Sequence, residues 1–198
     1  MKKHLFWGAI MVGVLYGTYF LSLPPKKHEE QSINIKKVAQ TDKFYTIRKD
    51  EYIYDGGAHG YTITRWNSFD KKTKVQINDK ILNDRKDERL NDLLRQGLIA
   101  YFAKYVPLYG GREFEPNKLN EEILVDVEEG NLPPPKGEPF LMEKGVGFMY
   151  GQYEISNYAN GQPAFVVPYY LMQPYMSAEI LALVEPIKYD TEIEPILP

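Results

Sequence analysis

Histidine is the residue type with which enzyme chemistry could begin in this chain of 198 residues, and it is scarce. Two of the three histidines lie in or beside an apolar N-terminal stretch, so a catalytic relay or an imidazole metal site in the body would need His59. Asp55 could orient its ring, but neither Ser68 nor Ser156 lies in a nucleophile-elbow sequence. One histidine also falls short of the usual zinc ligand sets. We therefore expect no enzyme activity, no cofactor and no metal site, with a hydrolase that uses His59 as the weaker alternative.

Tyrosine is abundant, with sixteen residues. Its ring gives a large contact area with a polar tip, which suits the recognition of proteins or sugars. The competing interpretation places these side chains at half-buried positions of strands and helices. We predict that a subset of the tyrosines, together with His59, forms a ligand-binding rim. The residues of this rim are Tyr54, His59, Tyr61, Tyr153 and Tyr158.

Two strands should carry the first part of this rim. Phe44 to Asp55 and Ala58 to Phe69 alternate β-branched or aromatic residues with polar ones, which is typical of strands with one buried face. The dipeptide Gly56-Gly57 between them supplies the positive φ of a tight hairpin turn. Alternate residues of a strand lie on the same face. One such set contains Tyr45, Ile47, Tyr61, Ile63 and Arg65, and the other contains Thr62, Thr64 and Trp66.

The stretch from Gly145 to Met176 predicts two further strands and the core. Aromatic residues near Phe148 and the apolar run from Ala164 to Val167 have strand character. Pro163 and Pro168 bracket the second run, so this strand should be short or lie at an edge. Turn-forming residues separate the two strands, namely Ser156, Asn157, Asn160 and Gly161. We expect two strands joined by a compact turn.

A long amphipathic helix should begin at Asn83 or Asp84 and end at Pro107. Gly97 within it costs about 1 kcal/mol relative to alanine, which indicates a close packing contact. Apolar residues recur every three or four positions, at Leu90, Leu94, Leu98 and Tyr101. These elements predict an α+β fold, with an antiparallel sheet of about five strands and this helix packed on one face.

Two sets of residues resemble a known family. YGQYEISNYANGQPAFVVPY, from Tyr150 to Tyr169, resembles the closing signature of the RsiV-type domain of unknown function, found in lysozyme-sensing anti-sigma factors and related bacterial envelope proteins. Gly56 to His59 and Phe69 to Thr73 resemble the opening of the same domain, although Lys74 stands where the family usually has glycine. The resemblance spans about Phe44 to Met176. The matching residues of the closing signature are Tyr153, Glu154, Ile155, Tyr158, Ala159, Gly161, Pro168 and Tyr169.

The resemblance implies a non-enzymatic binding or sensing module of the bacterial envelope. The best-known relatives bind lysozyme, a strongly basic protein. Without Lys2 and Lys3 the chain carries 22 basic and 27 acidic residues, a net charge of −5, which suits such a partner and disfavours nucleic acid. Because the family domain also accompanies peptidoglycan deacetylases, a cell-wall glycan-binding accessory domain is the alternative, and a purely structural envelope role is a third. No sigma factor is expected as a partner, because only four residues precede the apolar stretch.

The apolar stretch from Leu5 to Leu23 has 19 residues without a charge. At 1.5 Å per residue this length is close to that needed to cross a bilayer core. Bulky residues at its end favour an uncleaved signal anchor over a signal peptide. We expect a single-pass protein of the cytoplasmic membrane whose body is periplasmic or extracellular. The predicted segments are 1–23 as anchor or signal peptide, 24–42 as a polar tether, 43–176 as the RsiV-type domain, and 177–198 as a short helix with a proline-rich acidic tail.

Overall fold

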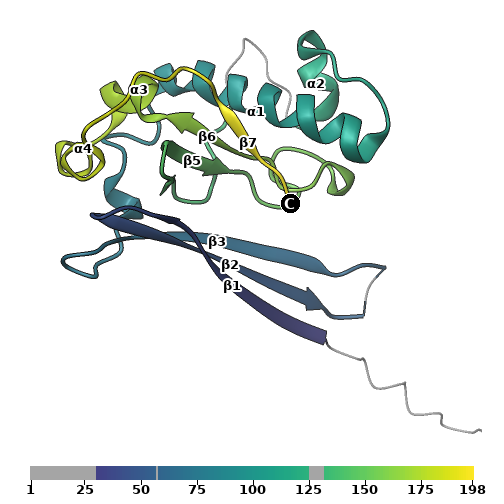
Figure 1. Cartoon of the computed structure of the whole chain (residues 1–198). Helices are drawn as coiled ribbons and strands as arrows, with labels where there is room; N and C mark the ends of the chain where they lie inside the picture. The colour runs from purple at the N-terminus through teal and green to yellow at the C-terminus, as the bar shows by residue number, and fades with distance from the viewer. Residues whose placement is uncertain (1–29, 57, 125–131) are drawn as a thin grey trace, which may run out of the picture.

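Two antiparallel sheets and a helical layer lie one on another in the computed structural model (Figure 1), which describes residues 30–56, 58–124 and 132–198. The first sheet contains, in order, β1 (Glu30–Gln40), β2 (Phe44–Tyr54) and β3 (Tyr61–Asp70). The second sheet contains, in order, β4 (Phe140–Leu141), β5 (Gly145–Met149), β6 (Ala164–Pro168) and β7 (Glu194–Ile196). Helix α1 (Asn91–Tyr105) packs on β6 and β7, on the side of the second sheet that faces away from the first.

The predicted α+β class, with one long helix packed on a sheet, is confirmed. The strands do not form one sheet of about five, however, but separate sheets of three and four strands. The reason lies in burial. All residues of β6 and four of the five residues of β5 are buried, so the second sheet needs a cover on both faces. The first sheet supplies one cover and α1 supplies the other.

The predicted hairpin is confirmed, with β2 and β3 paired from Phe44 opposite Asp70 to Ile53 opposite Tyr61. The polar tether predicted for 24–42 is wrong over residues 30–40, because they form β1 and pair with β2. The sequence signal was weak since most of the side chains of β1 are exposed, and only Ala39 is buried against the core. The backbone ladder with β2 fixes this strand, and its hydrogen bonds do not depend on side-chain type.

The C-terminal tail is also part of the sheet. The short helix predicted over 178–184 is confirmed as α4 (Ala178–Val184), where the Ser177 hydroxyl accepts a hydrogen bond from the Ile180 amide. Beyond it, β7 pairs with β6, so the tail is not simply a loose extension. Consequently β6 is short, as its flanking prolines predicted, but it lies inside the sheet and not at an edge.

The long helix begins later than predicted. A 3-10 turn, η2 (Glu88–Leu90), precedes α1 and is capped by Asp87 and not by Asn83 or Asp84. The predicted end at Pro107 is also wrong, because the chain continues as a π-helical turn, η3 (Val106–Gly110), up to the left-handed Gly111. Gly97 has the expected packing contact, since a Cβ there would lie 2.1 Å from the Phe165 ring of β6.

The remaining helical segments are short. They are the helices α2 (Leu119–Glu122) and α3 (Tyr169–Met172) and the 3-10 turns η1 (Asn78–Lys80), η4 (Pro116–Lys118), η6 (Tyr158–Asn160) and η7 (Gln173–Tyr175).

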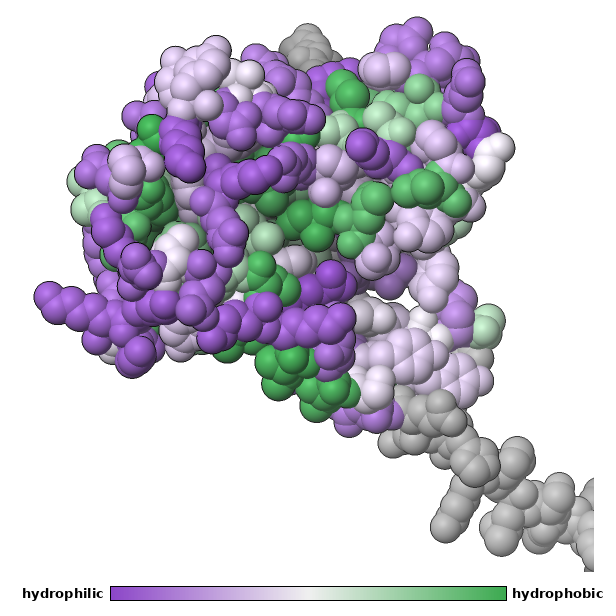
Figure 2. Space-filling view, in the orientation of Figure 1, coloured by the Kyte–Doolittle hydropathy of each residue, from purple (hydrophilic) through white to green (hydrophobic). Residues whose placement is uncertain are grey.

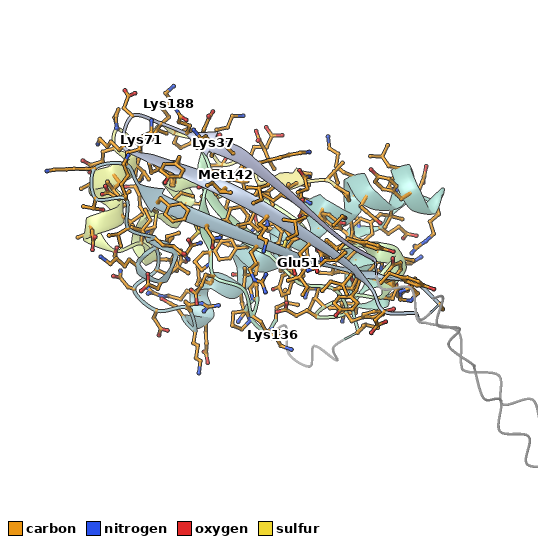
Figure 3. The ribbon with its side chains drawn as sticks, turned by 90° about the horizontal axis from the view of Figure 1, so that it is seen from below. Lys37, Glu51, Lys71, Lys136, Met142 and Lys188 are labelled. Atoms are coloured by element: carbon orange, nitrogen blue, oxygen red, sulfur yellow. The ribbon has the colours of Figure 1, made fainter. Side chains whose placement is uncertain are left out.

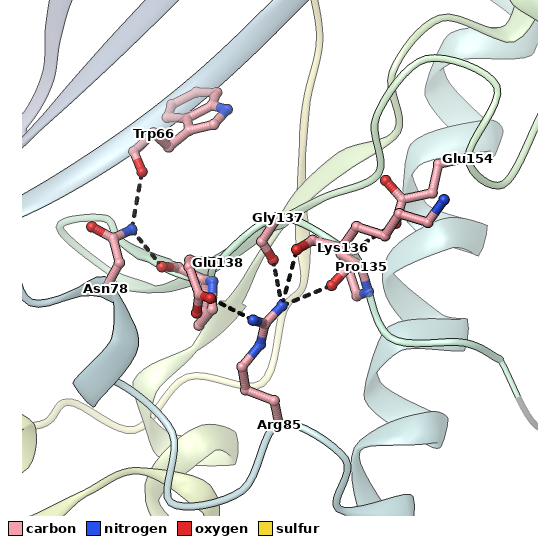
Figure 4. Close-up of polar contacts among 9 residues, drawn as sticks. Trp66, Asn78, Arg85, Pro135, Lys136, Gly137, Glu138 and Glu154 are labelled. Atoms are coloured by element: carbon pink, nitrogen blue, oxygen red, sulfur yellow. Dashed lines mark hydrogen bonds and ion pairs between the residues drawn. The ribbon is translucent and has the colours of Figure 1, made fainter.

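Buried polar contacts join the two sheets at one end, which we name the closed end of the junction and define by Thr46, Ser68, Asn78 and Leu141. The Thr46 hydroxyl donates to the Leu141 carbonyl at 2.6 Å, and the Leu141 amide donates to the Ser68 hydroxyl at 2.8 Å. The Asn78 side chain accepts from the Ser68 amide at 2.7 Å and donates to two carbonyls, those of Trp66 at 3.0 Å and Pro139 at 2.7 Å (Figure 4). These bonds fix the distance between the sheets.

The segment that leads into β4 is held by charged side chains. The Arg85 guanidinium donates to the carbonyls of Pro135 and Gly137, both at 2.9 Å, and to the Glu138 carboxylate at 2.5 Å (Figure 4). The Glu154 carboxylate accepts from the Lys136 amide at 2.5 Å. The proline-rich loop is therefore positioned by side chains rather than by a backbone ladder.

The segment predicted to cross the membrane, residues 5–23, lies outside the described residues. Within the described ranges 30–56, 58–124 and 132–198, no helix combines the length and apolar character that a membrane span requires. In the same described part of the chain, no group of three or more histidine, aspartate or glutamate side chains is placed to hold a metal ion.

Candidate functional site

The two sheets separate toward the tip of the β2–β3 hairpin and leave a pocket of about 290 Å³, which we name the junction pocket. Figure 2 shows the surface hollowed between the first sheet and the layer above it. The hairpin supplies Arg48, Thr62, Thr64 and Trp66 to its wall, and the opposite side supplies Met149, Gln152, Tyr158, Gly161, Gln162, Ala164 and the C-terminal residues Ile196, Leu197 and Pro198. The pocket therefore combines aromatic, amide and guanidinium groups from segments far apart in the sequence.

The floor of the pocket is the inner face of the first sheet. The Arg48 guanidinium lies 5.2 Å from the centre of the Trp66 ring and forms an ion pair with Asp50 at 2.8 Å. Asp50 also accepts a hydrogen bond from the Thr64 hydroxyl at 2.8 Å. The Trp66 indole N–H points to the Met149 sulfur at 3.1 Å, which closes the inner end of the pocket. These contacts hold the guanidinium and the indole in place before any ligand binds.

The opposite wall is the 151–162 loop, and α1 positions it. The hydroxyls of Tyr101 and Tyr105 donate to the carbonyls of Asn160 at 3.1 Å and Ala159 at 3.0 Å. Burial raises the pKa of both tyrosines, so both hydroxyls stay protonated and can donate. Gly161 is required here, because its φ is +69° and a Cβ would lie 2.9 Å from the Tyr101 hydroxyl.

The turn inside this loop forms as its residue types predicted. The Asn157 side chain accepts from the Asn160 amide at 3.1 Å and caps η6. The Asn160 side chain donates to the Glu122 carbonyl at 3.2 Å, which ties the turn to α2. The Gln162 amide then crosses to the hairpin and donates to the Thr62 carbonyl at 2.7 Å. The loop and the hairpin are thus bonded directly at the edge of the pocket.

Two of the predicted rim residues lie against a third that lines the pocket, and we name the three the aromatic cluster: His59, Tyr153 and Tyr158. The ring centres of His59 and Tyr158 lie 4.2 Å apart, and those of Tyr153 and Tyr158 lie 6.0 Å apart. Tyr153 and Tyr158 are 53% and 41% exposed, so their rings are available to a partner. Tyr153 also has a φ of +60°, a conformation that is rare for residues other than glycine.

The other two predicted rim residues do not join this cluster in the same way. Tyr61 pairs with Ile53 and lies on the outer face of the first sheet, on the side opposite the junction pocket. Tyr54 is the last residue of β2 and lies next to the hairpin turn. Like Tyr52, it belongs to the set of alternate residues on the inner face of the sheet. The structure therefore brings three of the five predicted residues together, and the side-chain alternation of the hairpin places Tyr61 on the other face. The role of these residues in binding a ligand stays a prediction.

Several residues of the site were not predicted from the sequence. Arg48 and Trp66 lie on the inner parity of the hairpin, which the alternation could have identified once the buried face was known. Gln152 and Gln162 flank the recognised turn, but no local pattern marks them as lining a pocket. Leu197 and Pro198 enter the site only through the pairing of β7 with β6.

The arrangement is suited to holding a ligand. Aromatic faces at the mouth can stack on rings or sugars, and the amide and guanidinium groups inside can donate hydrogen bonds. The His59 ring contacts Tyr158, and its Nδ1 lies 3.1 Å from the Gly60 carbonyl. Its role in this geometry is to extend the aromatic surface.

Known structures share the fold that carries this site, a mixed α/β domain with two antiparallel sheets. A DUF3298 family protein from Pseudomonas aeruginosa PAO1 superposes with a TM-score of 0.57 at 16% identity, covering 76% of this chain and 63% of that chain. A member of the same family from Bacteroides fragilis superposes with a TM-score of 0.56 at 20% identity, covering 79% of this chain and 58% of that chain. This chain therefore spans less than two thirds of either structure, and the likeness concerns the fold alone.

No family model matches the sequence. No curated protein matches it either. The structural neighbours thus give this chain a fold shared with domains of unknown function.

Proposed function

We propose that this chain is a non-enzymatic binding or sensing module of the bacterial envelope, anchored in the membrane through residues 5–23. The observation that carries the proposal is the contact of His59 and Tyr153 with Tyr158, whose side chain lines the junction pocket. Exposed aromatic side chains beside a polar pocket are typical of recognition sites. The resemblance to the RsiV-type domain supports the same conclusion, since residues of both of its motifs, His59 and Tyr153 with Tyr158, form this cluster.

The proposed partner is lysozyme or a similar basic secreted protein. The chain has a net charge of −3 and a sequence pI of about 5.7, which favours association with a basic surface. The aromatic cluster would supply the contact area, because tyrosine buries a large surface with little loss of conformational entropy. Charge would then act on the rate of encounter and the aromatic contact on the lifetime of the complex.

The test is a binding titration of the full chain in detergent with lysozyme, at low and at moderate salt. We expect saturable binding that persists at moderate salt and that Tyr158→Ala weakens about tenfold or more. Tyr170→Ala is the matched control, because Tyr170 is 43% exposed against 41% for Tyr158 but lies on α3, away from the pocket. Equal affinities of the two variants and the unchanged chain would contradict this surface.

A cell-wall glycan is the second candidate ligand, and the lining of the pocket favours it. Tyr158 supplies an exposed ring, while Gln152 and Gln162 supply amides, and this combination suits sugar hydroxyls above an aromatic face. Titration with soluble peptidoglycan fragments separates the two candidates. Binding that Gln152→Ala abolishes, without any binding of lysozyme, would assign the site to the glycan.

The non-enzymatic part of the proposal has its own test. Wall fragments incubated with the full chain should stay intact, and His59→Ala should leave their composition unchanged. Turnover by the unchanged chain that His59→Ala removes would establish the hydrolase alternative instead.

A further inference from the structure

Among the described residues, no helix or strand covers the outer face of the first sheet, and this face has a large apolar share. We define it by the side chains of the parity opposite to the junction pocket, which are Gln31, Ile33, Ile35, Lys37 and Gln40 of β1, Tyr45, Ile47, Lys49, Glu51 and Ile53 of β2, and Tyr61, Ile63, Arg65, Asn67 and Phe69 of β3. Figure 3 looks onto this face, with the three strands in front of the other elements and with Lys37 and Glu51 labelled. Ile33 and Ile35 are 54% and 62% exposed. A solvated sheet face is normally polar, so this one calls for a partner.

Aromatic rings lie among the isoleucines of this face. Tyr45 stacks on Phe69 with ring centres 5.1 Å apart, and the Lys37 ammonium lies 5.7 Å from the Tyr45 ring centre. Tyr61 lies at the other end of the face and is exposed. Tyrosine with flanking lysine is the composition found where a protein meets the headgroup region of a bilayer, because both side chains combine an apolar stem with a polar end.

The charges of the face have one dominant sign. Glu51 is the single acidic residue among the fifteen residues that define the face, and its carboxylate lies 3.2 Å from the Lys49 ammonium and 3.4 Å from the Arg65 guanidinium. The hydrogen bond and charge of Lys49 lower the pKa of Glu51, so this pair is ionised at neutral pH. With Lys37 the face keeps an excess of positive charge, which anionic headgroups attract.

The chain itself would hold this face close to a bilayer. The apolar stretch ends at Leu23, and β1 begins at Glu30, so six residues separate the predicted anchor from the first residue of the face's edge strand. Six extended residues reach roughly 20 Å. The first sheet would therefore stay within a short distance of the headgroups whenever the anchor spans the membrane.

We propose that the outer face of the first sheet lies against the lipid surface, with its isoleucine and aromatic side chains at the level of the headgroups. This inference rests on the membrane anchor of the proposed function. It assigns opposite faces of one sheet to two tasks, since the inner face then lines the junction pocket and faces away from the bilayer. A ligand would approach the aromatic cluster from the side of the molecule rather than from beneath it.

The absence of cysteine permits a direct test. The Ile35→Cys variant of the full chain is spin-labelled and reconstituted into vesicles of phosphatidylcholine and phosphatidylglycerol. The label then reports its collisions with a water-soluble nickel chelate and with oxygen. Leu108→Cys is the matched control, because Leu108 is 65% exposed and lies in η3, which directly follows α1 on the second sheet. We expect nickel contact at position 35 to be lower than at position 108 by roughly threefold or more, with oxygen contact raised.

Each other outcome overturns the inference at a defined step. If the protein does not float together with the vesicles, the predicted anchor is wrong. Both the membrane-anchored module and the lipid contact of the outer face are then contradicted. If the protein floats but the labels at positions 35 and 108 contact nickel equally, the outer face does not lie on the lipid surface. The proposal of an anchored binding module is not affected by this result. If spin labels at position 35 couple with each other, and this coupling disappears on dilution with unlabelled chain, a second copy of the chain covers the face instead of lipid. Replacing phosphatidylglycerol by phosphatidylcholine should reduce the nickel protection, because the attraction of Lys37 and Arg65 is lost.

Discussion

The two sheets of this protein use the same antiparallel ladder for different purposes. The second sheet is packed on both faces, by α1 on one side and by the first sheet on the other, and its strands β5 and β6 contain no charged residue. The first sheet is packed on its inner face only, and its strands alternate buried with exposed or partly exposed residues. A sheet with two covered faces serves mainly as core, whereas a sheet with one free face can also present that face to a partner.

The junction between the sheets shows the same contrast on a smaller scale. At the closed end, Thr46, Ser68 and Asn78 are buried and bonded to backbone groups of the opposite layer. At the open end, Arg48, Gln162 and Tyr158 surround a pocket. Stability is therefore concentrated at one end and binding groups at the other, which allows the site to present polar side chains without weakening the core.

The largest expected effect comes from the second sheet. Phe165→Ala removes a fully buried ring of β6 and should lower the free energy of unfolding by about 3–5 kcal/mol, measured by urea denaturation of the full chain in mild detergent. Ile35→Thr, on the free face of the first sheet, keeps a β-branched residue and should change it by less than about 0.5 kcal/mol. Similar losses for both substitutions would contradict the contrast between the sheets.

The closed end of the junction should rank next. Asn78→Ala leaves the Ser68 amide and the carbonyls of Trp66 and Pro139 without their buried partner, so we expect a loss of about 2–4 kcal/mol in the same assay. Asn67→Ala, on the outer face of β3, is the control and should change stability by less than about 0.5 kcal/mol. A loss no greater than that of the control would mean that Asn78 does not bind the sheets together.

Gly97→Ala tests how tightly α1 packs on the second sheet. An exposed helical glycine gains about 1 kcal/mol on replacement by alanine. Here the new methyl group would lie 2.1 Å from the Phe165 ring, and overpacking of this kind costs about 1–3 kcal/mol. The net result should be a loss of up to about 2 kcal/mol in urea denaturation. A gain in stability would show that the helix can move away from β6.

Alkaline pH gives the most gradual effect, because each buried tyrosine contributes separately and only as the pH rises. Burial raises the pKa of Tyr101, Tyr150 and Tyr169 above the unfolded value near 10. Above about pH 10 the unfolded state therefore binds fewer protons than the folded state, and stability, which is complete below that pH, falls by up to about 1.4 kcal/mol per pH unit for each group.

The substitution Tyr169→Phe isolates one of these groups. It removes the hydrogen bond to the Met142 carbonyl, so it should cost about 1 kcal/mol at neutral pH. Its stability should then fall less steeply above about pH 10, and the curves of the two proteins should converge roughly one pH unit higher. Parallel curves in urea denaturation at each pH would contradict the proposed cause.

The elements with strong local patterns were predictable from the sequence. The hairpin over Phe44 to Phe69, the turn at Asn157 to Gly161 and the helix α4 follow from alternation, turn-forming residues and a serine cap. Strands β1 and β7 were not predictable, because their side chains are mostly exposed or partly exposed and only pairing with another strand orders them. The beginning of α1 was misplaced because several residues before Asp87 could also cap a helix.

The sequence alone determined which residue types were available: one histidine for the body, no cysteine, many tyrosines, and the α+β class with its long helix. It also determined the parity of each side chain along the hairpin, since this follows from the two-residue period of a strand. Only the tertiary structure decided that these strands form two sheets, that Tyr61 faces away from the pocket, and that Tyr153 and Tyr158 meet His59. The physical reason is that periodicity is a local property, whereas the face that becomes buried depends on packing between segments about a hundred residues apart.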